Sequence, residues 1–340
     1  MHRSELTVDL GALRRNVRTL LRALEGAALW VVVKADGYGH GAVDVSRAAL
    51  DAGADALCVA TVAEALELRR ELPAARILCM GPLRSSEIAV ARDADVEVAV
   101  SGDDIPEGVR VHLKLDTGMG RYGLAELGTP TRDVVGLMSH LATADTDVVF
   151  AREQIARFAE LVRPYRGALE CHIANSAAAL RLPEARFDAA RCGIAVYGLS
   201  PFMDDPAVDE LEPVLRWQSH LAQVKLLNVG ESTGYGRRFV AERPTWIGLV
   251  PVGYADGFRR DLTGSEVRVE GEPRKVVGTI SMDSFAVELD RELSVGTPVT
   301  LLGDGVLAEA HARVAGTINY ELVTGISSDP RRARRRAVGG

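Results

Sequence analysis

The sequence predicts an α/β protein in which a (β/α)8 barrel is followed by a mainly antiparallel β domain. Between about residue 28 and residue 200, short apolar β-rich runs alternate with Ala/Leu/Arg/Glu stretches of helical period, the pattern of parallel strands joined by crossover helices. Beyond residue 212 the sequence pattern changes to short runs rich in Val, Thr and Gly, separated by turn sequences such as NVGES and SVGTP. Short β-rich runs separated by turns are typical of an antiparallel sheet.

Eight apolar runs supply the predicted barrel strands. They are continuous rather than alternating, so we expect both faces of each strand to be buried. Periodicity alone does not distinguish a closed barrel from a doubly wound open sheet, and the number of runs favours the barrel. In chain order the runs are LWVVVKA from 29, ADALCVA from 54, ARILCMG from 75, VEVAV from 96, VRVHLKLD from 109, VVGLMSHLA from 134, LECHIANS from 169 and ARCGIAVYG from 190.

Two of the barrel connections are too short for a full crossover helix, which normally takes a dozen or more residues. They are SGDDIPEG at 101–108 and YGLAELGTPTRD at 122–133. We expect turns there, and the strands beneath should expose more apolar surface than their neighbours unless a loop or a partner chain covers them.

The predicted domains are a barrel over residues 1–212 and a β domain over 213–330, followed by a tail at 331–340. The tail carries five arginines and ends in AVGG, so we expect it to be flexible and solvated.

Composition excludes several classes of protein. The chain has 340 residues, of which 47% are hydrophobic and 26% charged, with a net charge of -7, which is unlike a disordered or nucleic-acid-binding chain. Without a leader or a long apolar run, a cytoplasmic, non-membrane protein is expected. Four scattered cysteines and seven histidines form no metal motif, so no metal is expected, and the cysteines are predicted to be buried.

Lys34 closes an apolar strand, which is unusual because a buried ammonium is costly. The carboxyl end of a barrel strand is where catalytic groups gather, and a desolvated lysine suits carbonyl chemistry. A lysine that simply reaches into water would look the same in sequence. The glycine-rich stretch at 37–41 favours the catalytic interpretation, since such a turn lets backbone amides approach an anion.

VVVKADGYGHG resembles the cofactor-lysine motif of the alanine racemases, pyridoxal phosphate enzymes of fold-type III with a barrel and a C-terminal β domain. Further motifs follow in the family's order along nearly the whole chain. They are LKLDTGMGR at 113–121, SHLATAD at 139–145, HIANSAA at 172–178, RCGIAVYGL at 191–199, GYGRRF at 234–239, VGYADG at 252–257, GTISMD at 278–283 and GTINYE at 316–321.

The resemblance implies an amino-acid racemase with two bases. Lys34 would bind pyridoxal 5'-phosphate covalently and act as one base, and Tyr235 from the second subunit of a homodimer would act as the other. Racemisation removes the Cα proton from one face and returns it on the opposite face, which calls for two opposed acid/base groups. A tyrosine starts near pKa 10 and needs cationic neighbours, which the resemblance supplies as Arg121 and His140.

The resemblance also implies the cofactor site. Arg191, braced by His172, would face the pyridine nitrogen and leave it unprotonated, because a guanidinium stays protonated. Hydroxyls and amides would hold the phosphate. The implied cofactor residues are Lys34, Tyr38, His140, His172, Asn175, Ser176, Arg191, Gly193, Ile194 and Tyr320.

For the substrate, the resemblance assigns the carboxylate to Arg121 and the amide of Met282, and an entrance narrowed by Tyr254 and Tyr320. Lys114 matches a position that often carries a carbamate, although a plain salt-bridged lysine fits equally. The family's SYG is Gly234-Tyr235-Gly236 here, which would loosen the loop that carries the second base.

The implied function is interconversion of L-alanine and D-alanine, supplying D-alanine for peptidoglycan. A racemase of broader specificity, acting on serine for example, is the alternative. A related decarboxylase is disfavoured because its glycine-triplet and cysteine motifs are missing. A non-catalytic cofactor carrier is disfavoured by the presence of both Lys34 and Tyr235, since binding alone needs no second base.

Overall fold

The computed structural model describes residues 3–340, which form two compact units: residues 12–212, and residues 3–11 together with 213–340. We call them the barrel unit and the β unit. Eight parallel strands close the barrel, because β9 pairs with β2 in the register Trp30↔Arg191. The predicted fold class, a parallel barrel with a mainly antiparallel second sheet, is confirmed.

Each of the eight predicted apolar runs contains one barrel strand. The strands are β2 (Ala28–Val32), β3 (Ala56–Val59), β4 (Ile77–Cys79), β5 (Glu97–Val100), β6 (Val111–Lys114), β7 (Val134–Met138), β8 (Glu170–His172) and β9 (Ala189–Cys192). Nearly all of their residues are buried, as continuous apolar runs predict. The four cysteines are likewise buried and free.

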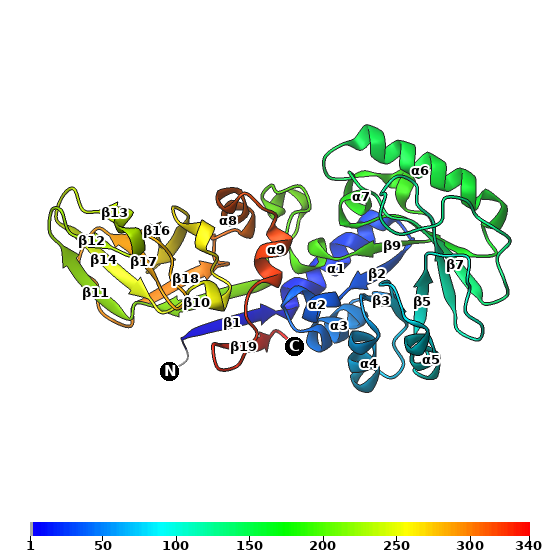
Figure 1. Ribbon diagram of the computed structural model, residues 1–340, viewed down its shortest axis with the longest axis horizontal. Helices are drawn as coiled ribbons and strands as arrows, with labels where there is room; N and C mark the ends of the chain where they lie inside the picture. The colour runs from blue at the N-terminus through cyan, green and yellow to red at the C-terminus, as the bar shows by residue number, and fades with distance from the viewer. Residues whose placement is uncertain (1–2) are drawn as a thin grey trace. The chain divides into compact units, whose positions relative to one another are not determined.

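Helices cover the outside of the barrel, and Figure 1 shows α3, α4 and α5 side by side along the strands that they connect. The helices are α1 (Leu10–Leu24), α3 (Ala42–Asp51), α4 (Val62–Glu71), α5 (Ser85–Asp93), α6 (Val148–Val162) and α7 (Ser176–Arg181). The segment labelled α2 (Lys34–Tyr38) is a turn with left-handed residues, and the short 3-10 turns are η1 (Arg163–Tyr165), η2 (Pro183–Ala185), η3 (Ile194–Tyr197) and η4 (Pro206–Asp209). In α1, Leu13, Val17, Leu20 and Leu24 form the helical stripe that is buried. Among residues 3–340 no helix has the length and apolarity to cross a bilayer.

The two connections predicted to be short, 101–108 and 122–133, contain no helix, as predicted. Of the two outcomes expected for the strands beneath, exposed apolar surface or cover by a loop or a partner chain, the structure shows cover, because Val98, Val111 and Leu113 are at most 2% exposed. The second connection folds back along β6, where Leu124 donates its amide to the carbonyl of Lys114 (2.8 Å). The chain's own segments therefore cover these strands.

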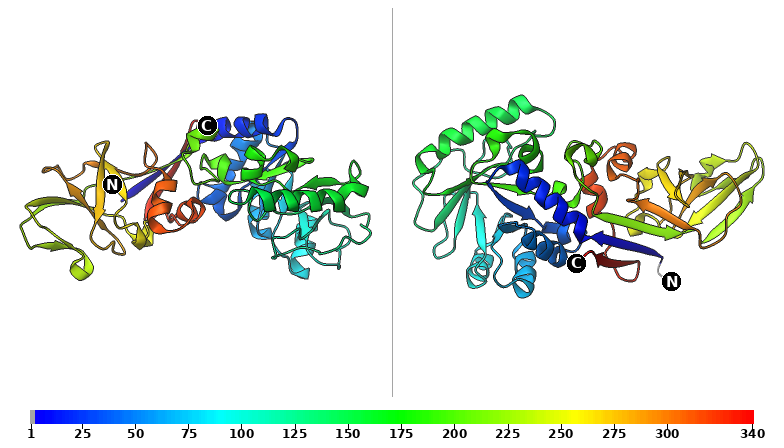
Figure 2. Two further views of the ribbon diagram at one scale, coloured as in Figure 1. Left: turned by 90° about the horizontal axis from the view of Figure 1, so that it is seen from above. Right: turned by 180° about the vertical axis from the view of Figure 1, so that it is seen from behind.

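The β unit is built on a nine-stranded sheet in the order β11-β14-β17-β16-β15-β18-β10-β1-β19, shown from two further sides in Figure 2. Its strands are β1 (Ser4–Asp9), β10 (Leu215–His220), β11 (Gln223–Leu227), β14 (Thr245–Val250), β15 (Glu266–Val269), β16 (Glu272–Val277), β17 (Phe285–Leu289), β18 (Pro298–Leu302) and β19 (Ala333–Val338). A two-stranded ribbon, β12 (Ser232–Thr233) with β13 (Phe239–Val240), and α8 (Ala308–Ala315), α9 (Asn319–Thr324), η5 (Tyr235–Arg237), η6 (Tyr254–Asp256) and η7 (Arg260–Leu262) complete it.

The ends of the chain depart from the predicted domains. Residues 3–11 belong to the β unit rather than to the barrel, and most of the predicted tail is strand β19, which pairs in parallel with β1. Ala333 is buried, and the Nε of Arg336 lies 2.7 Å from Glu5 on β1. The arginine side chains remain exposed on an edge strand, where charge discourages pairing with other chains. The tail was therefore predicted as flexible from its arginine content, although residues 333–338 form a strand.

If β19 is a strand, its amides should resist hydrogen exchange because the ladder with β1 must open first. Exchange measured by mass spectrometry should be slower across 333–338 than across the exposed turn at 229–231. Equal exchange of the two segments would restore the original expectation of a frayed tail.

Candidate active site

The chain turns sharply directly after Lys34, at the end of β2. Ala35, Asp36, Gly37 and Tyr38 all lie in the left-handed region, with φ of 52°, 52°, 62° and 54°. Each L-residue there costs roughly 1–2 kcal/mol. Strain of this kind persists only where the surroundings hold it, and it is typical of functional sites.

Two side chains hold this turn. The amide of Ala35 donates to Glu64 Oε1 (2.7 Å), and the amide of Ala42 donates to Asp36 Oδ1 (2.9 Å). Glu64 also accepts from the amides of Ala60 and Thr61 at the start of α4. Sequence reasoning missed Glu64, although its place three residues after Thr61 is the signature of a capping box.

Lys34 is half-buried, and its electrostatic surroundings favour the neutral amine. Burial lowers its pKa most, the positive charge of Arg121 lowers it further, and Glu64 opposes the shift. Arg121 itself is exposed, and no carboxylate among residues 3–340 pairs with it. Asp116 shapes the loop before it by accepting from the amides of Gly118, Met119 and Gly120. A cation is thus presented beside Lys34 without an internal counter-ion.

A set of amides and hydroxyls meets where α7 and η3 begin; we call it the cradle. Ser176 Oγ accepts from the amides of Gly193 (3.0 Å) and Ala195 (3.4 Å), while Asn175 Oδ1 caps α7 by accepting from Ala178 (3.0 Å). A Cβ on Gly193 would lie 2.4 Å from the hydroxyl oxygen of Tyr38, so only glycine permits this approach. The barrel thus brings together the predicted phosphate residues Tyr38, Ser176, Gly193 and Ile194 with the predicted cofactor residue Asn175, while the remaining predicted phosphate residue, Tyr320, belongs to the β unit.

Arg191 on β9 is buried, and burial lowers its pKa to about 10. One terminal nitrogen donates to His172 Nδ1 and to the carbonyl of His172 (3.1 Å), and the other donates to the carbonyl of Ser139. Nε takes part in none of these bonds and remains as a donor. The bracing of Arg191 by His172 that the resemblance implied is present in the structure.

His140 is surrounded by positive charge. Burial lowers its pKa to about 3, and Arg191, Lys114, Arg121 and Lys34 act in the same direction. His140 is therefore neutral near neutral pH and cannot supply the positive charge that was expected of it. It contributes a ring nitrogen 3.4 Å from Arg191.

Two residues that sequence reasoning missed extend this network through the barrel. His112 Nδ1 lies 2.9 Å from His172 Nε2, and His112 Nε2 lies 2.9 Å from Glu97 Oε2. All three side chains are buried. The available signal was the alternation in VRVHLKLD, which places His112 and Lys114 on the same face of β6.

Lys114 is buried on β6, and its Nζ lies 5.5 Å from the centre of the Tyr122 ring. Burial lowers its pKa to about 8, with Arg121 and Arg191 contributing and Asp116 opposing. None of the salt bridges of residues 3–340 involves Lys114, which disfavours the plain salt-bridged lysine.

The remaining predicted site residues lie in the β unit, and they are described here only within it. Tyr235, Tyr254 and Met282 are exposed by 73%, 44% and 51%. Segment 278–284 links them, because Thr279 Oγ1 donates to the carbonyl of Tyr235 (2.7 Å) and the amide of Tyr254 donates to Ser281 (3.1 Å). Tyr320 is placed on α9.

Gly234, the departure from the family's SYG, has φ of 77°, and a Cβ there would lie 2.9 Å from the amide nitrogen of Thr279. Glycine therefore lets the Tyr235 turn pack closely on segment 278–284, which favours a held turn over the loosened loop that was expected. Tyr235 and Thr279 line a cavity of about 420 Å³.

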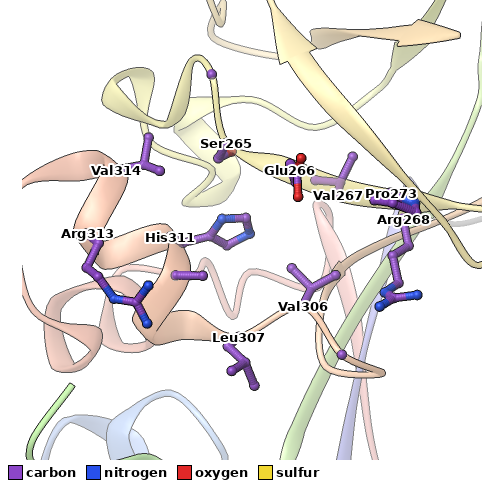
Figure 3. A pocket seen from close by; sticks show the side chains of 13 residues that line it. Ser265, Glu266, Val267, Arg268, Pro273, Val306, Leu307, His311, Arg313 and Val314 are labelled. Carbon is purple, nitrogen blue, oxygen red and sulfur yellow. The ribbon is translucent and has the colours of Figure 1, made fainter. Parts of the chain in front are cut away.

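A second cavity of the β unit, about 540 Å³, lies between β15 and α8 and is lined by residues such as Ser265, Arg268, His311 and Arg313. Figure 3 shows these side chains around the hollow. It includes none of the predicted site residues, so we assign it no part in the chemistry.

Comparison with known proteins identifies the family. Residues 8–201 match the alanine racemase N-terminal domain, and residues 214–335 match the alanine racemase C-terminal domain. Alanine racemase 1 of Bacillus subtilis (strain 168) is 41% identical over 350 residues, covering 94% of this chain and 90% of the relative. The alanine racemase of Streptomyces lavendulae, a D-cycloserine producer, has a crystal structure that is 37% identical with a TM-score of 0.92, covering 100% of this chain and 98% of the other.

A third solved structure, the Bartonella henselae alanine racemase, is 25% identical with a TM-score of 0.87, covering 98% of this chain and 99% of the other; it holds covalently bound pyridoxal phosphate. The fold and these matches thus define an amino-acid isomerase of a pyridoxal phosphate-dependent family. The chain belongs to the alanine racemase family.

The contact between Tyr38 and Gly193 predicts the effect of adding one methyl group. Gly193→Ala should lower the free energy of unfolding by about 1–3 kcal/mol, because overpacking displaces the Tyr38 ring. Gly128→Ala is the control, since nothing lies within 4 Å of its Cβ. Urea unfolding measures both; indistinguishable stabilities of the two variants would mean that Tyr38 yields freely.

Proposed function

We propose that this chain interconverts L-alanine and D-alanine with pyridoxal 5'-phosphate bound at the carboxyl end of the barrel. The observation that carries the proposal is Lys34 itself: a half-buried amine of lowered pKa at the end of β2, with Arg121 acting on it electrostatically and the strained turn leading to the cradle. An amine of lowered pKa gives up its proton more easily, which suits it both to covalent attachment and to accepting a proton. D-alanine made in this way would supply cell-wall peptidoglycan.

The residues of the barrel fit the cofactor. The cradle offers the amide of Ile194 with the hydroxyls of Tyr38 and Ser176 to a phosphate, without the mobility of lysine side chains, and the amide of Gly193 holds the Ser176 hydroxyl in place. The Nε of Arg191 remains to donate to the pyridine nitrogen. When bound, pyridoxal phosphate supplies the electron sink that makes the Cα proton removable.

Two of the chain's own groups then move the proton. Lys34 would take it from one face of Cα, and Tyr235 would serve the opposite face. Of the two cationic neighbours expected for Tyr235, only Arg121 is charged, because His140 is neutral. Arg121 is therefore the one cation beside the second base in this proposal.

We infer that Tyr235 comes from a second copy of the chain in a homodimer. Large side chains exposed together usually mark an interaction surface, and Tyr235, Tyr254 and Met282 form such a group on the β unit. Their exposure supports a site completed by two subunits.

The substrate carboxylate would bind Arg121, which lacks an internal carboxylate partner, and the amide of Met282. Tyr254 and Tyr320 would narrow the entrance to favour the methyl side chain of alanine. Comparing kcat/KM for alanine and serine tests this preference directly.

Lys114 is suited to carry a carbamate, because an amine of pKa about 8 is partly neutral near neutral pH and can add CO2 with release of a proton. The resulting negative charge would orient Arg121. ¹³C NMR of the protein equilibrated with labelled CO2 distinguishes the carbamate from a free amine.

Covalent attachment can be mapped. Borohydride treatment of the cofactor-loaded protein should bleach its yellow colour and leave the cofactor fixed to Lys34, since reduction makes the bond to the amine irreversible. Peptide mass mapping locates it, with Lys34→Ala as control. An adduct on Lys114 or Lys225 instead would contradict the assignment of Lys34 as the cofactor-binding lysine.

Site sharing predicts complementation. Tyr235→Phe should lower kcat by about 10²- to 10⁴-fold, the usual contribution of a general base. Mixing it with Lys34→Ala should restore activity, because one of the two sites in a heterodimer then carries both native residues.

The control mixes Lys34→Ala with the Lys34→Ala/Tyr235→Phe double variant, which has no native site in any pairing. If heterodimers form, shown by a tag on one partner, and remain as inactive as this control, the two bases do not come from different subunits.

A further inference from the structure

A continuous line of buried polar side chains runs from Arg191 through His172 and His112 to Glu97. Arg191 donates directly to His172 Nδ1. His172 Nε2 lies 2.9 Å from His112 Nδ1, and His112 Nε2 lies 2.9 Å from Glu97 Oε2. The line crosses the barrel interior, since its members come from β5, β6, β8 and β9. It is a built feature of the core rather than a surface cluster.

The direction of every hydrogen bond in this line is determined by its two ends. Arg191 can only donate, so His172 Nδ1 must carry a lone pair, and its Nε2 must carry the proton. His172 Nε2 therefore donates to His112 Nδ1, and His112 Nε2 donates to Glu97. An ionised Glu97 can only accept, so the far end imposes the same direction.

The surroundings hold both ends in these states. Hydrogen bonds from His112 and Arg76 outweigh burial and lower the pKa of Glu97 to about 2, so it stays ionised. Burial and the charge of Arg191 lower the pKa of His172 well below its usual value, so it stays neutral. Arg76 also pairs with Glu170 and stacks over Trp30, which contacts both imidazoles.

The chain also makes room for His112. A Cβ on Gly136 of β7 would lie 2.2 Å from His112 Nδ1, so a larger residue there would displace the ring. Glycine inside a strand often marks such a close approach.

We propose that His112, held by Glu97, is a positioning residue that keeps His172 in the Nε2-protonated tautomer and thereby fixes the guanidinium of Arg191 toward the cofactor ring. The inference rests on the proposed function for its catalytic consequence, and on the barrel alone for the tautomer. Without an acceptor at His112, the Nε2 proton of His172 has no partner, and a shift of that proton to Nδ1 would break the bond from Arg191.

Two substitutions at His112 separate positioning from packing. His112→Gln retains an amide oxygen that can accept from His172 and an amide nitrogen that can donate to Glu97. His112→Phe fills the space without either function. Gly136→Ala keeps histidine at position 112 but displaces its ring. It is the second disruptive variant, and it replaces His112→Phe if that variant does not fold. Leu137→Ala, a fully buried change on the same strand outside the network, controls for lost stability.

The first measurement needs neither cofactor nor turnover. ¹⁵N NMR of histidine side chains in the apoenzyme should show His172 neutral with its proton on Nε2 in the native protein, His112→Gln and Leu137→Ala. In His112→Phe and Gly136→Ala the tautomer or protonation of His172 should change. An unchanged His172 signal in these two variants overturns the proposal, whether or not the protein racemises alanine.

The second measurement is kinetic. His112→Phe and Gly136→Ala should lower kcat by about 10- to 100-fold, by analogy with the loss of residues that orient metal-binding histidines. The KM for alanine should stay close to native, because Arg191 does not bind the substrate carboxylate in this scheme, and His112→Gln should recover most of the rate. A native kcat in both disruptive variants, or an equal loss in Leu137→Ala, overturns the positioning role.

Discussion

The guanidinium of Arg191 sets the constraint around which the barrel interior is arranged. A buried cation is costly unless its N–H groups find acceptors. Here His172 Nδ1 and the backbone carbonyls of His172 and Ser139 accept hydrogen bonds from Arg191. Burial lowers the pKa of His140 and His172, and the charge of Arg191 lowers both further, because an imidazolium beside it would add repulsion to desolvation. Arg191 also contributes to the lowered pKa of Lys114.

The opposite end of the network shows how that cation is tolerated. Glu97 is buried and ionised, and it contacts Arg76 and Arg110 as well as His112. Two neutral imidazoles separate the anion from Arg191, so the charges are linked through oriented hydrogen bonds instead of direct contact. Replacing either imidazole with an apolar group leaves a donor or an acceptor without a partner, which costs more than the lost bond itself.

Much of the fold was predictable because it depends on local pattern. Continuous apolar runs predicted all eight barrel strands, and short polar connections predicted the missing helices. The prediction left open what covers those strands, because no local pattern shows that the loop folds back through Leu124. Motif order identified most barrel site residues. The alternation in VRVHLKLD could have pointed to His112, but its contacts with His172 and Glu97 join strands that are distant in sequence and no spacing predicts them. The charge state of His140 likewise depends on four cations that are distant in sequence.

The pairing of β1 with β19 has a consequence for how the chain acquires its structure during synthesis. All strands of the barrel lie between residues 28 and 192, so that unit is complete once residue 212 has left the ribosome. The nine-stranded sheet places the first strand of the chain between β10 and the last strand. Because domains fold as units in the order of their synthesis, strand β1 must stay unpaired after the barrel has folded, until β10 and β19 have been synthesised. Strand β1 is therefore made before the barrel strands and reaches its final pairing after them.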